Sequence, residues 1–553
     1  MASFQRKISN KPQGTTDKSD HNLDAVVIGA GFSGIYLFHR LRKEGFNVKL
    51  IEAGNAIGGV WHWNNYPGAR VDSQYPVYAL AIPEVYDTWQ WTETYPGAPE
   101  LQRYFKHIDN VLDISKDTLY NTRVNSATWN DSDNTWKIQC DNGTSITTRF
   151  MHCCLGFAAK RHFPDWKGLE DYKGYICHSS FWPVEGVDMK GKRVAVIGNG
   201  ATGIQIAQEA ARDASQLGVY IRTPNTTIPM QQRPVDPVQA KKDLATIGDK
   251  LERLRFENAG GFLFTGQNKN CFDDPLEVRE KVLNDALDYG GFKVLFQYND
   301  LLTDEKANAY IYSVVNKRNR ARMTNAAKRD LLAPEIPPHP FMGKRPSLEQ
   351  DYYEQMDKDH VEIIPIKQNP VDHVTETGIV TADGKLHEYD IIAIATGFDS
   401  ITGGFMEIDI TGVDGENLQK KWNGPKGAWT YLGMSVAKFP NMLFTYGPQA
   451  PTAYGNGPSI VEPQAEFIVD VMKKMKAEGK TKIDAKEKAE QDWKELVNTM
   501  HEKTLRHNVD SWYMGTNIPG KPRQVLNYAG TLPMYMKTIR EVLDKNYDGF
   551  TVT

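Results

Sequence analysis

Two glycine clusters with the same spacing are the first residues in this chain that could hold a ligand. The glycines, each set spaced G-x-G-x-x-G, are Gly29, Gly31, Gly34 and Gly198, Gly200, Gly203. In such a motif the first glycine allows a tight turn, the second lets the backbone approach a pyrophosphate, and the third permits close packing of a helix on a sheet. The phosphates lie over the N-terminus of that helix. The spacing therefore predicts two dinucleotide sites.

The residues that follow each glycine cluster distinguish the two expected dinucleotides. Glu52 ends the strand after the first cluster, where a carboxylate accepts hydrogen bonds from a ribose diol. Arg222 and Thr223 occupy the equivalent place after the second cluster, and an arginine pairs with a 2′-phosphate that a carboxylate would repel. Lys344 is a further candidate for that phosphate. We therefore expect FAD at the first site and NADP(H) at the second.

Each glycine cluster lies between a strand and a helix that could position it. Apolar runs within residues 24–31 and 193–200 end in the glycines. Apolar residues at helical spacing follow each cluster, and a second strand comes next, at 47–54 and at 218–223. These two strand–helix–strand units predict an α/β fold with two Rossmann-like dinucleotide-binding domains.

The remainder of the chain divides by composition. Residues 226–334 show long helical periodicities and no strong strand, which predicts a mostly helical insertion, and residues 462–499 resemble a pair of surface helices. Prolines crowd residues 332–346, which must form an extended connector. The other expected parts are a flexible tail (1–22), an FAD-binding domain in two pieces (23–155 and 376–553, with a mobile C-terminal loop) and an NADP-binding domain in two pieces (156–225 and 335–375).

The overall composition argues against several classes of protein. The 553 residues carry a net charge of -4, which gives no electrostatic reason to expect nucleic acid or a membrane surface as a partner. No apolar run reaches transmembrane length. The cysteines, including the adjacent Cys153 and Cys154, have neither metal-site nor redox-pair spacing, which argues against a disulfide reductase. We expect a cytoplasmic protein without a metal, either monomeric or weakly oligomeric. Electron-transfer reductases and oxygen-activating monooxygenases remain.

A third motif separates these remaining classes. Residues 172–183 have the pattern Y-x-G-x-x-x-H-x-x-x-W-P and lead directly into the second glycine cluster. This stretch closely resembles the fingerprint F-x-G-x-x-x-H-x-x-x-W-P of type I Baeyer–Villiger monooxygenases, and only Tyr172 departs from it. Flavin-containing monooxygenases and N-hydroxylating enzymes usually have Tyr or Phe at the Trp position, so Trp182 favours the Baeyer–Villiger branch. Four further segments resemble parts of that family: 58–72, 342–346, 394–399 and 512–523.

The resemblance implies roles for further residues. It identifies 58–72 as a flavin-proximal loop and 512–523 as a mobile C-terminal loop. Besides the residues named above, it places the following at the cofactors: Ser33, Gly59, Val60, Trp61, Arg70, Asp72, Tyr78, Thr202 and Trp512. The fingerprint residues, expected to act in hinge motion and domain coupling, are Gly174, His178, Trp182 and Pro183. We do not expect His178 to be a general base.

The resemblance also places Arg345 over the flavin, and the chemistry of its side chain supports that role. A permanently charged guanidinium stabilises both a peroxide anion and the negative adduct formed when that peroxide attacks a ketone. Asp72 would orient Arg345 through a charge-assisted hydrogen bond. Lys344 and Arg345 are adjacent in an extended segment and point to opposite sides, so that one can serve the 2′-phosphate and the other the flavin.

The resemblance implies a Baeyer–Villiger monooxygenase that acts on a small-molecule ketone. In that chemistry NADPH reduces FAD, the reduced flavin reacts with molecular oxygen to give a C4a-peroxide, and the peroxide converts the ketone to an ester or lactone. The alternative is a flavin-containing monooxygenase that oxygenates an amine nitrogen or a sulfide sulfur. A flavin-bound redox sensor is disfavoured by the Arg345 segment. The stretch 447–458, rich in Gly and Pro, is expected to contribute to the substrate pocket.

Overall fold

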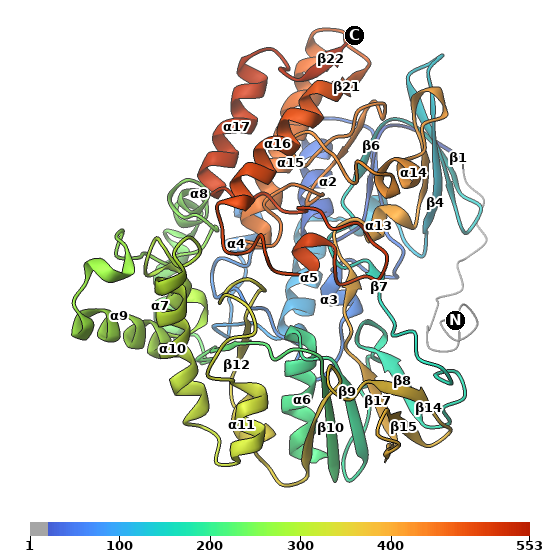
Figure 1. The fold of residues 1–553 in the computed structure, drawn as a ribbon. Helices are drawn as coiled ribbons and strands as arrows, with labels where there is room; N and C mark the ends of the chain where they lie inside the picture. Colours follow the sequence, from blue (N-terminus) through green and yellow to red (C-terminus); the bar gives the residue numbers. More distant parts are fainter. Residues whose placement is uncertain (1–19) are drawn as a thin grey trace.

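The computed structural model describes residues 20–553 and contains two large sheets, seen in the upper and lower halves of Figure 1. The first sheet has the strand order β19-β4-β5-β6-β1-β2-β3, and β20 pairs with β6. Its strands are β1 (Asp20–Ile28), β2 (Val48–Ile51), β3 (Thr118–Leu119), β4 (Val124–Asn130), β5 (Thr135–Cys140), β6 (Ser145–Cys153), β19 (Asp409–Thr411) and β20 (Met442–Phe444). Because β1 pairs in parallel with both β2 and β6, the ends of three strands meet beside the first glycine cluster.

Helices cover one face of this first sheet. They are α2 (Phe32–Lys43), α3 (Val60–Trp63), α4 (Pro83–Tyr86), α5 (Ala98–Leu112), α15 (Gly457–Ala477), α16 (Glu487–Glu502) and α17 (Leu532–Asp544). Successive residues of a strand point to opposite faces, so Val27 packs with these helices while Val26 packs in a second core on the other face. That other face is covered by segments that include α13 (Gly403–Met406) and α14 (Leu418–Asn423).

The second sheet is entirely parallel and has the strand order β13-β10-β9-β17-β8. Its strands are β8 (Tyr175–His178), β9 (Arg193–Ile197), β10 (Gln216–Ile221), β13 (Val361–Pro365) and β17 (Ile391–Ile394). The second glycine cluster lies between β9 and α6 (Ala201–Asp213), and α12 (Tyr352–Met356) packs against α6. A small antiparallel sheet of β14 (Val371–Val374), β15 (Gly378–Thr381) and β16 (Leu386–Glu388) precedes β17.

Three sequence-based expectations need correction. The expected tail, 1–22, overlaps β1, which begins at Asp20, and residues 1–19 lie outside the described residues. The boundary expected at residue 376 is too early, because β17 hydrogen-bonds between β9 and β8 of the second sheet. The helices expected within 462–499 are present, but α15 is largely buried and is not a surface helix.

The insertion after β10 is helical, as its periodicity indicated. Its helices are α7 (Pro237–Leu244), α8 (Ile247–Glu257), α9 (Leu276–Tyr289), α10 (Glu305–Arg320) and α11 (Ala326–Leu332), which form their own apolar core on the left of Figure 1. At its base β11 (Thr227–Pro229) pairs in parallel with β12 (Ser347–Glu349), which follows the proline-rich connector. This pairing closes the insertion and brings the Arg345 segment back beside β10.

The chain crosses between the two sheets through two short antiparallel strands. The outgoing crossing contains β7 (Lys160–Arg161) and the returning one contains β18 (Phe398–Asp399), and the two pair with each other. The crossing is therefore a defined two-stranded element.

After α16 the chain runs across the middle of the molecule (Figure 1). The strand before α16, β21 (Ile483–Ala485), pairs with β22 (Phe550–Val552) near the C-terminus.

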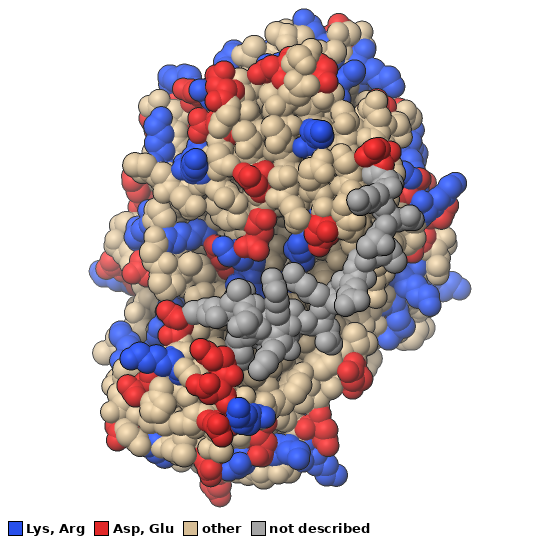
Figure 2. Space-filling view, turned by 90° about the vertical axis from the view of Figure 1, so that its right-hand side faces the viewer, with Lys and Arg blue, Asp and Glu red and all other residues tan. Residues whose placement is uncertain are grey.

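The molecular surface carries charges of both signs. Figure 2 shows Lys and Arg side chains interspersed with Asp and Glu side chains over one face, without a large area of a single sign. Within residues 20–553, no helix combines the length and the apolar character needed to cross a bilayer.

A buried ionic network ties the insertion to the first sheet. Arg255 of α8 pairs with both Glu462 and Glu466 of α15, and the Tyr36 hydroxyl on α2 donates to Glu466 at 2.6 Å. Glu462 also accepts a hydrogen bond from the Ala81 amide at 2.7 Å. Burial raises the pKa of Glu462 to about 7, although Arg255 pulls it down. Because this carboxylate lies between two parts of the fold, its charge must be compensated where they meet.

Arg255→Met is expected to lower the stability of the protein by about 3 kcal/mol, because it leaves the buried Glu462 carboxylate without a positive charge beside it. The folded-state pKa of Glu462 lies above its unfolded value, so its contribution to stability falls as the pH rises between these two values. Without Arg255 that fall extends to higher pH. The loss in Tm should therefore be larger at about pH 8 than at about pH 6. The double variant Arg255→Met with Glu462→Gln should recover part of the lost Tm. An equal loss of Tm at both pH values in Arg255→Met would contradict this prediction.

Candidate active site

The first glycine cluster is built so that backbone atoms meet without side chains between them. Gly29 has φ +105°, and a Cβ on Gly34 would lie 1.8 Å from the Gly29 carbonyl oxygen. Gly31 precedes the first turn of α2, so the N-terminus of that helix faces the motif. The Cα of Gly31 lies so close to Gly59 that a Cβ on Gly59 would approach it to 2.9 Å. The structure therefore brings the predicted Gly59 beside the first glycine cluster.

Glu52 lies at the end of β2 and holds this loop in place. Its carboxylate accepts hydrogen bonds from the Ala30 amide at 2.9 Å and from the Gly54 amide at 2.7 Å. Burial raises the pKa of Glu52, and these two backbone donors partly offset that rise. A carboxylate anchored by backbone donors at the end of the second strand is suited to accept hydrogen bonds from a ribose.

The flavin-proximal loop brings most of its predicted residues to this region. The Trp61 indole on α3 donates to the Tyr78 hydroxyl at 2.9 Å, and the two rings meet edge to face. Val60 packs beside them, and the Ser33 hydroxyl contacts the Thr445 hydroxyl.

Arg70 differs from the other loop residues in that the protein itself engages its guanidinium. The side chain pairs with Glu93 and donates to the Tyr95 carbonyl. A cofactor role for Arg70 stays a prediction with no support from these contacts.

The second glycine cluster repeats the first. Gly198 has φ +110°, and a Cβ on Gly203 would lie 2.0 Å from the Gly198 carbonyl oxygen. A Cβ on Gly200 would meet no atom within 4 Å, so the backbone there faces open space at the N-terminus of α6. Thr202 on the same helix donates to the Tyr66 hydroxyl at 3.4 Å. This open cradle fits a pyrophosphate.

Two cations beyond the end of β10 form a basic pair. Arg222 is exposed and Lys344 is half-buried, and neither makes a hydrogen bond or ion pair with the residues that the structure describes. Burial lowers the pKa of Lys344, and the neighbouring charge of Arg222 lowers it further. Thr223 is half-buried beside Arg222. Two cations that destabilise each other provide a site for an anion.

Arg345 is held where three parts of the chain converge. Its Nε and Nη2 both lie 2.9 Å from Oδ2 of Asp72, and its Nη1 donates to the Ala453 carbonyl at 2.8 Å. The guanidinium lies 4.8 Å from the Phe292 ring centroid. Burial alone would lower the pKa of Arg345, but the Asp72 carboxylate outweighs this and raises it. Arg345 is therefore a fixed positive charge, and it faces different neighbours from Lys344.

The fingerprint residues form a joint between the second sheet and the returning crossing. His178 is fully buried, its Nε2 donates to the Gly397 carbonyl at 3.0 Å, and its Nδ1 accepts from the Ser180 amide at 3.2 Å. Burial lowers the pKa of His178 to about 3, so the imidazole is neutral and unsuited to general-base chemistry.

The other fingerprint residues support the same joint. Trp182, followed by the half-buried Pro183, packs in the core of the second sheet. A Cβ on Gly174 would lie 2.8 Å from the Asp390 carbonyl oxygen, just before β17. These contacts tie the fingerprint to the second sheet, and its coupling role stays a prediction.

The C-terminal loop closes over the middle of the molecule. The Trp512 ring stacks on the Phe157 ring, with 5.7 Å between the ring centroids. The Asn517 side chain donates to the Phe398 carbonyl of β18 at 2.8 Å. Arg506 donates to the Met342 carbonyl at 3.1 Å, next to the Arg345 segment. The predicted Trp512 is thus placed at the crossing between the two sheets.

Sequence reasoning did not assign roles to several residues near Arg345. They are Phe292, Tyr446, Ala453 and Tyr513, together with Tyr454, which packs on Tyr513. Ala453 and Tyr454 lie within the Gly- and Pro-rich stretch 447–458, whose composition was the available signal. Ala453 contributes a backbone carbonyl, which no residue-type pattern reveals.

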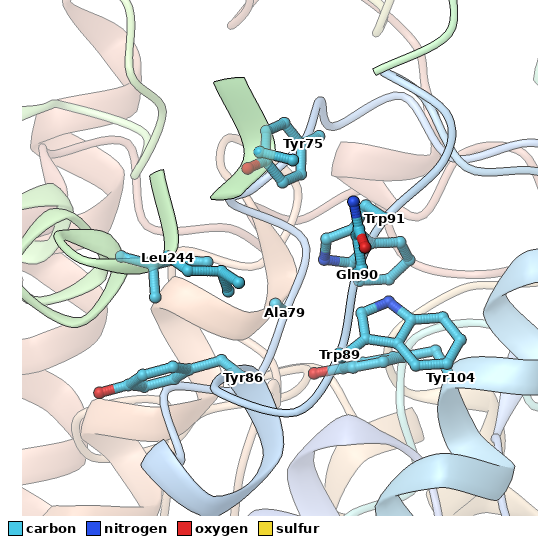
Figure 3. A pocket seen from close by; sticks show the side chains of 10 residues that line it. Tyr75, Ala79, Tyr86, Trp89, Gln90, Trp91, Tyr104 and Leu244 are labelled. Carbon is cyan, nitrogen blue, oxygen red and sulfur yellow. The ribbon is translucent and has the colours of Figure 1, made fainter. Parts of the chain in front are cut away.

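A separate aromatic pocket lies between the first sheet's loops and the insertion, as Figure 3 shows. Its lining residues are Tyr75, Ala79, Tyr86, Trp89, Gln90, Trp91, Tyr104, Ala240, Leu244 and Ile247. None of the predicted site residues lines it, so it is distinct from the site around Arg345. No cluster of His, Cys, Asp or Glu within residues 20–553 could hold a metal ion.

Comparisons with known proteins place the chain in a family. A family model for flavin-binding monooxygenase-like proteins matches residues 23–233. Cyclopentanone 1,2-monooxygenase of Comamonas sp. (strain NCIMB 9872) is 40% identical over 543 residues, which cover 98% of each protein. The crystal structure of cyclohexanone monooxygenase from Rhodococcus sp. Phi1 bound to NADP+ matches with a TM-score of 0.93 at 32% identity, covering 97% of this chain and 100% of that chain. The chain belongs to the type I Baeyer–Villiger monooxygenase family.

The chain is accordingly an NADPH- and FAD-dependent monooxygenase with an α/β fold. The structure of OTEMO in complex with FAD and NADP matches it with a TM-score of 0.91 at 33% identity, covering 96% of this chain and 99% of that chain. The two glycine cradles fit these cofactors, because backbone atoms exclude side chains at Gly34 and Gly203, while the backbone at Gly200 faces open space.

Alanine substitutions within the second cradle should separate cofactor binding from folding. Gly200→Ala places a methyl group in open space, so Tm and FAD content should stay normal while the KM for NADPH rises about tenfold, because the methyl group blocks the pyrophosphate. Gly203→Ala forces a clash with the Gly198 carbonyl and should lower Tm instead. Thermal melts, flavin absorbance and steady-state kinetics measure these effects. A normal KM for NADPH in Gly200→Ala would contradict the assignment of this cradle.

Proposed function

We propose that the protein converts a small-molecule ketone to an ester or lactone by inserting one oxygen atom from molecular oxygen beside the carbonyl. The observation that supports this proposal is the Asp72–Arg345 pair, a fixed positive charge at the junction of both cofactor-binding parts and the insertion. The relative from Comamonas is named for cyclopentanone, which supports a small ketone as the substrate class.

Arg345 supplies charge stabilisation without proton transfer. Reduced FAD, when bound, supplies the electrons and activates dioxygen. Negative charge then develops on the substrate carbonyl oxygen during the attack, and a preorganised guanidinium stabilises it without reorganisation. The Asp72 carboxylate and the Ala453 carbonyl accept hydrogen bonds from Arg345 and fix the orientation of the guanidinium, so that its position does not depend on the substrate.

Aromatic side chains around Arg345 limit access of water. Phe292 comes from the insertion, Tyr446 and Tyr454 from the 447–458 region and its edge, and Tyr513 from the C-terminal loop. Burial raises the pKa of Tyr446 and Tyr513, so both phenols stay neutral. An environment with few waters strengthens the electrostatic effect of Arg345.

The basic pair supports a preference for NADPH over NADH. Arg222 is free to pair with a 2′-phosphate, and Lys344 lies close enough to share it. The phosphate would relieve the repulsion that lowers the pKa of Lys344.

The test of the reaction class is product analysis across a substrate panel. Holoenzyme with NADPH and oxygen is offered cyclic and linear ketones, tertiary amines and thioethers, and products are identified by mass spectrometry. Esters or lactones from ketones support the proposal. Oxygenation of only the amine nitrogen or sulfide sulfur would replace it with the alternative of a flavin-containing monooxygenase.

Arg345→Ala should reduce ester formation about 100- to 1,000-fold, because one preorganised charge at the developing oxyanion is removed. NADPH oxidation should continue at a measurable rate, since the cradles for both cofactors are untouched. The ratio of ester formed to NADPH consumed is the readout, with Arg212→Ala, an exposed arginine on α6, as the control. Near-normal ester formation in Arg345→Ala would overturn the proposed role.

Arg222→Ala should raise the KM for NADPH about tenfold or more and leave the KM for NADH nearly unchanged, because only NADPH carries the 2′-phosphate. Lys344→Ala should act in the same direction. Steady-state kinetics with the two coenzymes measure this selectivity. Equal effects on both coenzymes would remove the 2′-phosphate role of these residues.

A further inference from the structure

Arg506 is a buried cation that has no carboxylate partner among residues 20–553. It is only 5% exposed, its Nε donates to the Met342 carbonyl at 3.1 Å, and its guanidinium also lies within hydrogen-bonding reach of the Tyr454 hydroxyl. Two carboxylates of neighbouring segments pair with other arginines: Asp510 with Arg523 at 3.1 Å, and Asp72 with Arg345. The acceptors that Arg506 has within the described residues, the Met342 carbonyl and the Tyr454 hydroxyl, are both uncharged. Burying a cation without a counter-charge is costly unless a ligand supplies the charge.

Arg506 lies against two aromatic rings, and one of them, Tyr513, also responds to the charge of Arg345. The Arg506 guanidinium lies 4.0 Å from the centroid of the Tyr454 ring and 5.9 Å from that of Tyr513. These two rings meet edge to face at 4.9 Å. Burial raises the pKa of Tyr513, and both Arg506 and Arg345 oppose that rise, so the phenol is within electrostatic reach of both charges. Arg345 is also bonded to Ala453, the neighbour of Tyr454.

The contacts of Arg506 leave its guanidinium free in a defined direction. Cation–π contact with Tyr454 compensates only part of the cost of burying the charge. The bond to Met342 uses Nε and fixes the plane of the guanidinium, so that its Nη edge can donate to a planar, two-oxygen acceptor as well as to the Tyr454 hydroxyl. The coenzyme's anionic groups have other proposed partners, namely Arg222, Lys344 and the cradle around Gly200.

We propose that Arg506 binds a carboxylate on the substrate, so that the enzyme favours ketones that carry a carboxylate group over neutral ketones. The carboxylate pairs with Arg506 while the ketone carbonyl lies toward Arg345, and the aromatic wall of Tyr454 and Tyr513 holds the carbon skeleton between them. This proposal rests on the proposed ketone oxygenation and names its substrate class.

The test compares a cyclohexanone that bears a ring carboxylate with its methyl ester, which differs only in the charge. Wild-type enzyme is expected to show a higher kcat/KM for the carboxylate. Arg506→Gln keeps a donor near the Met342 carbonyl but removes the charge, and should lower the carboxylate-to-ester ratio of kcat/KM about 10- to 100-fold. Arg506→Lys should retain most of that ratio, because it keeps the charge. Flavin content and Tm are measured for each variant.

Arg523→Gln is the matched control, since Arg523 is a cation on the same loop that already has a carboxylate partner. It should leave the ratio unchanged. An equal loss for acid and ester in Arg506→Gln, or a rise only in the KM for NADPH, would overturn the proposal.

A binding titration separates this proposal from the reaction class. Oxidised holoenzyme is titrated with the keto acid and its ester by calorimetry. Charge-dependent binding that Arg506→Gln abolishes would support the site even if no ester product formed, which would count against the proposed reaction alone. Binding of both probes with equal affinity by wild-type and Arg506→Gln enzyme would reject the site.

Discussion

The ion pair between Asp72 and Arg345 is the interaction on which the arrangement of this site depends. Asp72 lies on the flavin-proximal loop, Arg345 lies on the connector that returns from the insertion, and Ala453 comes from the C-terminal part of the chain. A partly buried guanidinium needs an anionic partner and well-oriented acceptors, so these three segments must meet in one geometry. The pair therefore couples the placement of the proposed catalytic charge to the packing of the segments that meet there.

Two further contacts hold the two sheets in position relative to this ion pair. The crossing strands β7 and β18 are joined to the second sheet by the hydrogen bond from His178 to Gly397. The flavin-proximal loop packs on α6, where Gln205 donates to the Arg70 carbonyl at 2.9 Å. A shift of one cofactor-binding part against the other would thus disturb both the fingerprint and the segment that carries Asp72. The fingerprint is therefore proposed to couple the two parts and not to take part in the reaction itself.

Much of the fold could be predicted because its signals are local. The glycine clusters require specific backbone approaches, and the structure shows the close contacts that exclude side chains at Gly34 and Gly203. The membership of β17 in the second sheet could not be predicted, since an apolar strand carries no mark of its neighbours.

Only part of the candidate site could be predicted from the sequence. Asp72 and Arg345 could be proposed because both are charged and lie in segments that resemble parts of the family, and the structure brings them together. Ala453 acts through its backbone, Phe292 arrives from a distant insertion, and the isolation of Arg506 depends on which carboxylates other arginines take. These are tertiary properties that spacing along a chain does not encode.

The central claim, that this site inserts an oxygen atom from dioxygen beside a ketone carbonyl, is tested most directly with isotopically labelled oxygen gas. Holoenzyme, NADPH and a cyclic ketone are incubated under the labelled gas, and the product is analysed by mass spectrometry with fragmentation. The account predicts a lactone with one labelled atom in the ring, between the carbonyl carbon and the migrated carbon. A lactone without label, or NADPH consumption that yields only peroxide with every ketone tested, would contradict it.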